Sequence, residues 1–222
     1  MHEKYLSAEM ILNMSEIQDW LSQFKENDRS TAESLLLRLK FISRDTYAEW
    51  LLSKLEELTS LKKVGMFAVR KLNDGESVWD ENNTGQKSSC SQGSEDLVLS
   101  IISQAKKLHP DIYFDHPSIY DIRARRVHHI VLLDDSTGSG KRVSKYLKSM
   151  SSNKTLLSWL SGGFITIHVV SYARTIQAEK VIRKRFPGSS HARRVKKVSD
   201  KLIFDSLVVN FLKFYHSNLI YR

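Results

Sequence analysis

Apolar residues recur every three or four positions through the first 60 residues, a spacing that predicts amphipathic helices. Because this spacing places each set on one helix face, we interpret the aromatic members as packing residues rather than as part of a ligand site. We therefore expect residues 1–60 to form an N-terminal helical segment. The three stripes are Ile17, Trp20, Leu21 and Phe24; Leu35, Leu36, Leu39 and Ile42; and Tyr47, Trp50, Leu51, Leu55 and Leu58.

From residue 61 onward, short apolar runs alternate with helical periods. Such alternation implies parallel strands joined by right-handed crossovers. The predicted fold over 61–222 is therefore α/β, a Rossmann-like, mostly parallel sheet flanked by helices. The expected strands are 64–69, 112–114, 130–133, 164–170 and 202–204, and the expected helices are 97–108, 143–150 and 175–185.

The segment 73–94 interrupts this alternation, because it is polar and carries Gly75, Gly85 and Gly93. This composition predicts a long mobile loop, and such a loop inside a compact domain is often a functional lid.

Composition narrows the class of protein. The 222 residues suffice for one domain with a helical appendage. No apolar run approaches the length of a membrane span, and the N-terminus lacks the layout of a secretory signal. Cys90 is the single cysteine, which excludes an internal disulfide. We expect a cytoplasmic protein with no membrane partner.

A net charge of +9 is the unusual bulk property, and it favours nucleic acid, phosphorylated metabolites or acidic proteins as partners. Much of it lies in the segment 180–201, which is either a solvated helix face and loop or a surface for RNA or DNA. Phe186 is its one aromatic residue, so base stacking is poorly supported. Its basic residues are Lys180, Arg183, Lys184, Arg185, Arg193, Arg194, Lys196, Lys197 and Lys201.

The most informative stretch is 130–142, where four apolar residues run into Asp134 and Asp135 and then into a loop of Ser, Thr and Gly. A strand that leads through such a loop into a helix N-terminus is a place where backbone N–H groups converge on an anion. Two carboxylates repel a bare phosphate, so the ligand should also offer hydroxyls or a divalent metal. A phosphorylated sugar with a free diol, carried with Mg²⁺, satisfies both requirements.

A Walker A loop is the alternative, because Gly140 and Lys141 form the Gly-Lys pair of that motif. The motif also needs a glycine five positions before Gly140 and a Ser or Thr after the lysine. Asp135 and Arg142 occupy those positions, which argues against this alternative.

The stretch 130–142 resembles the ribose-phosphate loop of the type I phosphoribosyltransferases, in which an apolar strand, two acidic residues and three variable residues precede Thr-Gly-x-Thr. The closer resemblance is to phosphoribosyltransferase-like proteins of bacterial conflict and antiviral defence systems, whose loop often reads Asp-Asp-x-x-Gly-Ser-Gly. That group also tends to begin with helices like Trp20-Leu21-Ser22-Gln23-Phe24 and Leu35-Leu36-Leu37-Arg38-Leu39. Arg142 departs from the family pattern, which usually has a small polar residue there.

The resemblance implies roles for these residues. Asp134 and Asp135 would be the catalytic pair, holding the ribose diol of phosphoribosyl pyrophosphate directly or through waters of Mg²⁺. From their position in the predicted fold, Arg70, Lys71 or a lysine of the segment 73–94 such as Lys87 would screen the pyrophosphate. The 5-phosphate would be wrapped by Ser136, Thr137, Gly138, Ser139, Gly140, Lys141 and Arg142, and the pyrophosphate cradled by Gly93, Ser94 and Glu95, where an ordinary helix cap is the alternative.

Three functions stay open on the sequence. In the first case, the protein is an enzyme that transfers or cleaves a phosphoribosyl or nucleotide group in antiviral defence. Alternatively, it is a non-catalytic module that senses a nucleotide. In the third case it docks on RNA or on protein partners of a defence complex through its basic segment. No segment identifies an acceptor base.

Overall fold

A computed structural model of the chain describes residues 7–39, 42–87, 94–185 and 202–208. The chain divides into two compact units, Met1–Ser43 and Arg44–Arg222. The expected boundary at residue 60 therefore lies at 43/44, because the last N-terminal helix packs with the second unit.

The first unit contains the helices α1 (Ala8–Leu12), α2 (Ser15–Ser22) and α3 (Glu26–Leu36). Leu21 and Ala32 are buried, and the ring of Trp20 meets that of Phe24 edge to face at 4.7 Å. Leu39, which the apolar pattern assigned to packing, is 75% exposed.

The second unit is built on one five-stranded sheet. Its strands are β1 (Val64–Ala68), β2 (Tyr113–Asp115), β3 (His129–Thr137), β4 (Thr166–Arg174) and β5 (Leu202–Val208). They are ordered β2-β1-β3-β4-β5, and every neighbouring pair is parallel. The predicted α/β, Rossmann-like architecture is confirmed.

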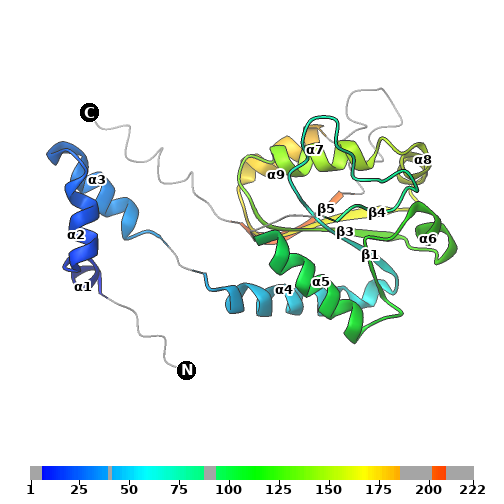
Figure 1. The fold of residues 1–222 in the computed structure, drawn as a ribbon, viewed down its shortest axis with the longest axis horizontal. Helices are drawn as coiled ribbons and strands as arrows, with labels where there is room; N and C mark the ends of the chain where they lie inside the picture. Colours follow the sequence, from blue (N-terminus) through cyan, green and yellow to red (C-terminus); the bar gives the residue numbers. More distant parts are fainter. Residues whose placement is uncertain (1–6, 40–41, 88–93, 186–201, 209–222) are drawn as a thin grey trace. The chain divides into compact units, whose positions relative to one another are not determined.

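Helices cover both faces of the sheet (Figure 1). α4 (Arg44–Leu58) and α5 (Ser94–Leu108) lie on one face, and α7 (Lys141–Met150) and α9 (Ile176–Arg185) on the other. The short α6 (Ile119–Ala124) and α8 (Lys154–Gly162), missed by the apolar pattern, begin at side-chain caps from Ser118 and Asn153. A single 3₁₀ turn, η1 (Thr59–Leu61), links α4 to β1.

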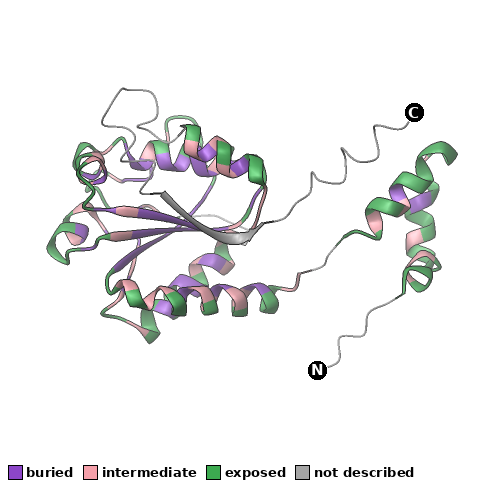
Figure 2. Ribbon diagram, turned by 180° about the vertical axis from the view of Figure 1, so that it is seen from behind, coloured by how far each residue is buried: buried purple, intermediate pink, exposed green. Residues whose placement is uncertain are grey.

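The central strands β1, β3 and β4 are mostly buried, which explains their almost continuous apolar sequence (Figure 2). Ile130 and Leu132 of β3 face the α7 side, where they share a core with Tyr146 and Leu147. α4 belongs to this unit, because Leu55 is buried and its carbonyl accepts a hydrogen bond from the hydroxyl of Tyr113 on β2.

The described part of the segment 73–94 is packed, contrary to the expectation of a mobile lid. Val78 and Trp79 are buried in the α7-side core. The Trp79 indole donates to the Met150 carbonyl at 2.8 Å, and Val78 N–H donates to Ser149 Oγ at 2.9 Å. Two apolar residues inside a polar stretch thus fasten it to the end of α7. Residues 88–93 lie outside the described chain.

Candidate functional site

The carboxyl ends of β1 and β3 lie side by side, as parallel pairing requires. Ala68 is level with Leu133, and Val69 N–H donates to the Leu133 carbonyl at 2.8 Å. Arg70 therefore emerges next to Asp134 at one edge of the sheet. This is the edge at which parallel α/β sheets bind ligands.

The acidic pair lies within β3 rather than beyond it, because pairing with β4 continues to Thr137 opposite Arg174. Side chains alternate along a strand, so Asp134 points to the same face as Leu132, under α7. Its side chain is 2% exposed, whereas that of Asp135 is 33% exposed. The two carboxylates thus have different surroundings although they are neighbours.

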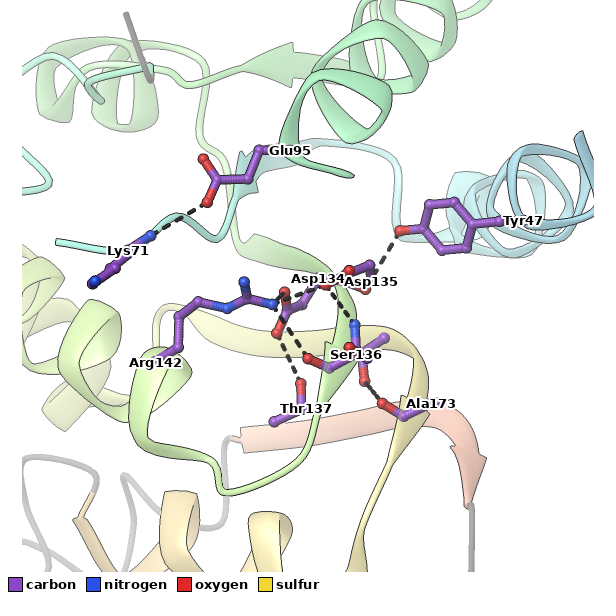
Figure 3. A network of polar contacts seen from close by, with 10 residues as sticks. Tyr47, Lys71, Glu95, Asp134, Asp135, Ser136, Thr137, Arg142 and Ala173 are labelled. Atoms are coloured by element: carbon purple, nitrogen blue, oxygen red, sulfur yellow. Dashed lines mark hydrogen bonds and ion pairs between the residues drawn. The ribbon is translucent and has the colours of Figure 1, made fainter. Parts of the chain in front are cut away.

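Arg142 joins the two carboxylates from the first turn of α7 (Figure 3). Its Nη2 lies 2.5 Å from Asp134 Oδ1 and 2.8 Å from Asp135 Oδ1, and it donates to the Ser136 carbonyl at 3.2 Å. The other oxygen of Asp134, Oδ2, accepts a hydrogen bond from Thr137 Oγ1 at 2.9 Å. One guanidinium therefore bridges the acidic pair.

Burial dominates the proton equilibrium of Asp134. It raises the pKa of this carboxyl to about 7, although the positive charge of Arg142 opposes the rise. Burial also opposes ionisation of Arg142, but the two carboxylates hold its pKa above the ordinary value. The pair is thus a partly neutralised acidic site at neutral pH, not two free carboxylates.

The turn after the strand is open to an anion. Gly138 and Ser139 are exposed, and Gly140 caps α7 in the left-handed conformation with φ 72°. The first turn of a helix leaves backbone N–H groups without partners inside the helix. Lys141 is exposed beside this turn. These residues supply donors where the resemblance places a 5-phosphate.

Arg70 and Glu95 come to the same edge, but each has a local partner. The Arg70 guanidinium is buried, pairs with Glu76 and donates to the Ser77 carbonyl at 3.1 Å. Glu95, from the first turn of α5, accepts a 3.4 Å hydrogen bond from Lys71 N–H (Figure 3). Arg70 therefore holds the segment 76–77, and Glu95 adds negative charge where the pyrophosphate was expected.

Several residues that the sequence placed at this site lie away from it or outside the described residues. Lys87 pairs with Asp115 at 2.5 Å at the end of β2. Gly93 and Cys90 lie outside the described residues, and Ser94 is described by its backbone alone, as the first residue of α5. Most of the basic segment, 186–201, is likewise not described.

Three aromatic residues that the apolar pattern assigned to packing, or passed over, stand at this site. The hydroxyl of Tyr47 on α4 donates to the Asp134 carbonyl at 3.4 Å (Figure 3). The rings of Tyr47, Trp50 and Tyr172 form a cluster with centroids 5.0 to 6.2 Å apart. Tyr172 lies between the partners of Asp134 and Ser136 on β4, level with Asp135. Trp50 and Tyr172 are half-buried, so the cluster is partly accessible. The sequence did not identify this cluster, because the helical spacing of Tyr47 and Trp50 is also that of residues that pack in a core.

A histidine pair occupies the opposite end of the sheet. His129 Nδ1 lies 3.1 Å from His168 Nε2, so one ring donates to the other. Burial lowers the pKa of His168 to about 4, with a smaller contribution from His129. The pair is neutral at pH 7 and joins β3 to β4.

Direct coordination of Mg²⁺ by the acidic pair does not fit this arrangement. Both oxygens of Asp134 are engaged by Thr137 and Arg142, and its side chain is almost fully buried. Among the described residues, no three His, Cys, Asp or Glu side chains are grouped to hold a metal ion. A guanidinium stands where a bridging cation would have to sit.

The sequence profile of the PRTase-CE family matches residues 17–213, which is most of the chain. The chain belongs to the PRTase-CE family. It is thus a phosphoribosyltransferase-like protein, as the loop at 130–142 and the parallel sheet predicted. No curated protein and no solved structure matches the chain significantly. In the described part of this family member, no helix has the length and apolar character needed to cross a bilayer.

Proposed function

We propose that this PRTase-CE protein binds phosphoribosyl pyrophosphate or a related nucleotide at the carboxyl edge of β1 and β3. The observation that carries the proposal is the succession of Asp134 and Asp135, the exposed turn at Gly138–Ser139 and the start of α7. Donors for a phosphate and acceptors for sugar hydroxyls lie within one stretch of nine residues, 134–142. The family membership supports the same ligand class.

Within this proposal, the exposed Asp135 accepts from a ribose hydroxyl, and the turn and α7 N-terminus hold the phosphate. In a transferase reaction, a nitrogen nucleophile attacks C1 of the ribose, and the C1–O bond to pyrophosphate breaks with its electrons leaving on that oxygen. The protein's part is positioning and electrostatic stabilisation. The exposed residues Lys71 and Lys141 supply positive charge at the edge.

A binding module without turnover is the second candidate, and two contacts favour it. Arg142 bridges the acidic pair, and Glu95 places a carboxylate where the leaving pyrophosphate would gather charge. Either activity suits a cytoplasmic effector or accessory component of a bacterial antiviral defence system, which is the role we propose. Protein partners of such a complex, or RNA bound by the segment 180–201, belong to the same proposal.

Calorimetric titration with phosphoribosyl pyrophosphate and with AMP tests this function. We expect saturable binding that the double variant Asp134→Asn/Asp135→Asn weakens by at least about tenfold. The matched control is Asp19→Asn/Asp28→Asn, which makes the same charge change on exposed positions of α2 and α3. Equal affinities in the wild type and the acidic-pair variant would contradict the site. Release of pyrophosphate in the presence of a trial acceptor would distinguish the enzyme from the module.

A further inference from the structure

The bridge between Arg142 and the acidic pair has the geometry of a bound cation. Nη2 lies within 2.8 Å of one oxygen of each carboxylate and also reaches the Ser136 carbonyl. A divalent ion shared by these carboxylates would need the same space. The cation at this place is supplied by the chain itself.

The carboxylate that is harder to reach is also the more fully engaged. Asp134 is 3% exposed, and Thr137 closes its second oxygen. A metal could bind Asp134 only after two hydrogen bonds were broken and a buried group was hydrated again, both of which cost free energy.

The charge count agrees with this geometry. When both carboxylates are ionised, they and the guanidinium carry a net charge of −1 instead of −2, so the attraction for a divalent cation is much weaker than that of a bare pair. Arg142 comes from the first turn of α7, two residues after Gly140, whose backbone is packed against α9. The guanidinium is therefore held at the pair by the same turn that forms the proposed phosphate site.

We infer that Arg142 takes the place of a divalent cation at the acidic pair, so that this site binds a ribose 5-phosphate group without metal. The inference rests on the proposed function for its ligand. The replacement of a cation by Arg142 at Asp134 and Asp135 does not depend on any ligand and can be tested on the protein without one. The half-exposed guanidinium, with 35% of its side chain accessible, also lies where it contacts the bound sugar phosphate.

Removal of the guanidinium tests the inference without any sugar ligand. Mn²⁺ alone is the probe, followed by its paramagnetic resonance signal at pH 8. Arg142→Ser should bind Mn²⁺ at this pair at least about tenfold more tightly than the wild type does, and Arg142→Lys should behave as the wild type. Arg125→Ser is the control, because Arg125 is exposed and its guanidinium contacts Asp121 at 3.8 Å and the Phe114 ring, not the acidic pair.

Ribose 5-phosphate provides the second measurement, because it lacks the pyrophosphate that would itself chelate a metal. Wild-type titrations in EDTA and in Mg²⁺ should give the same affinity, and this measurement stands even if Arg142→Ser fails to fold. Binding only in Mg²⁺ would overturn the inference and leave the proposed function intact. Absence of binding in both buffers would count against the proposed function, while Mn²⁺ affinities that are equal in the wild type and in Arg142→Ser would overturn the inference alone.

Discussion

Gly140 lies against the backbone of Ala178. A Cβ built on Gly140 would stand 2.7 Å from the Ala178 carbonyl oxygen and 3.2 Å from its Cα. Because the obstructing atoms are backbone, they cannot move without shifting α9. The turn that forms the proposed phosphate site is therefore fixed to α9 at one residue.

Gly140→Ala should destabilise the protein by about 2–4 kcal/mol, since it combines a left-handed φ with a backbone clash. Gly138→Ala is the matched control: Gly138 has open space around its Cβ position, so the cost should stay below about 1 kcal/mol. Urea unfolding of the two variants measures the difference. Equal stabilities would show that the turn is free to move.

Asp134→Asn should raise stability at alkaline pH. The folded protein holds the Asp134 proton up to about pH 7, whereas the unfolded chain releases it near the ordinary value of 3.8. The contribution of Asp134 to the free energy of unfolding therefore falls as pH rises from about 4 to 7, by ~4 kcal/mol at most, and does not recover above pH 7. The amide removes this loss. Unfolding free energies of both proteins at pH 4.5, 6 and 8 test it, and a constant difference across these values would contradict it.

His168→Gln should remove a pH dependence of the opposite sign. The folded protein holds His168 neutral down to about pH 4, whereas the ordinary imidazole gains its proton near 6.5. The contribution of His168 to the free energy of unfolding is fully present above pH 6.5 and is lost as pH falls towards 4, by ~3 kcal/mol at most. The single variant Asp134→Asn, which lacks the opposing effect of Asp134, should unfold more easily at pH 4.5 than at pH 6.5. The variant with both substitutions should show little change over this range.

Trp50 should report on ligand binding. Its ring stacks on that of Tyr47, whose hydroxyl donates to the Asp134 carbonyl, and it meets the ring of Tyr172 edge to face. AMP bound at the acidic pair should change the tryptophan emission, and Trp50→Phe should abolish the change. Trp159→Phe on α8, whose side chain packs against the α7-side core, should keep the change. A response that survives in Trp50→Phe would place the ligand elsewhere.

The sequence predicted the sheet well because the strands are short apolar runs between clear helical periods. It also identified the edge at which Asp134 and Arg70 meet, since parallel pairing brings the ends of neighbouring strands together. It did not predict that β3 continues through Thr137, because strand pairing depends on β4 and not on local composition. Polar segments that are pinned by one or two apolar residues, such as Val78 and Trp79, also escape a pattern based on averages.

The role of Arg142 illustrates a different limit. An arginine at position 142, where the family usually has a small polar residue, marked a departure from the family loop, but the sequence did not show that its guanidinium returns to Asp134 and Asp135. Tyr47 was hidden for a similar reason, because a helical stripe does not distinguish a ring that fills a core from one whose hydroxyl reaches a strand end.

The strand order has a consequence for how the chain folds during synthesis. Val64 pairs with Tyr113 on one side and with His129 on the other, and none of the five described strands pairs with the next one through a tight turn. β1 is therefore translated before either partner strand, so its backbone N–H and C=O groups have no strand to pair with and its apolar side chains stay exposed until β2 and β3 are made. Parallel sheets whose strands pair over such long sequence separations fold slowly, and their folding intermediates expose apolar surface that is prone to aggregation. The yield of folded protein should accordingly depend on translation speed and chaperones more than on the final stability.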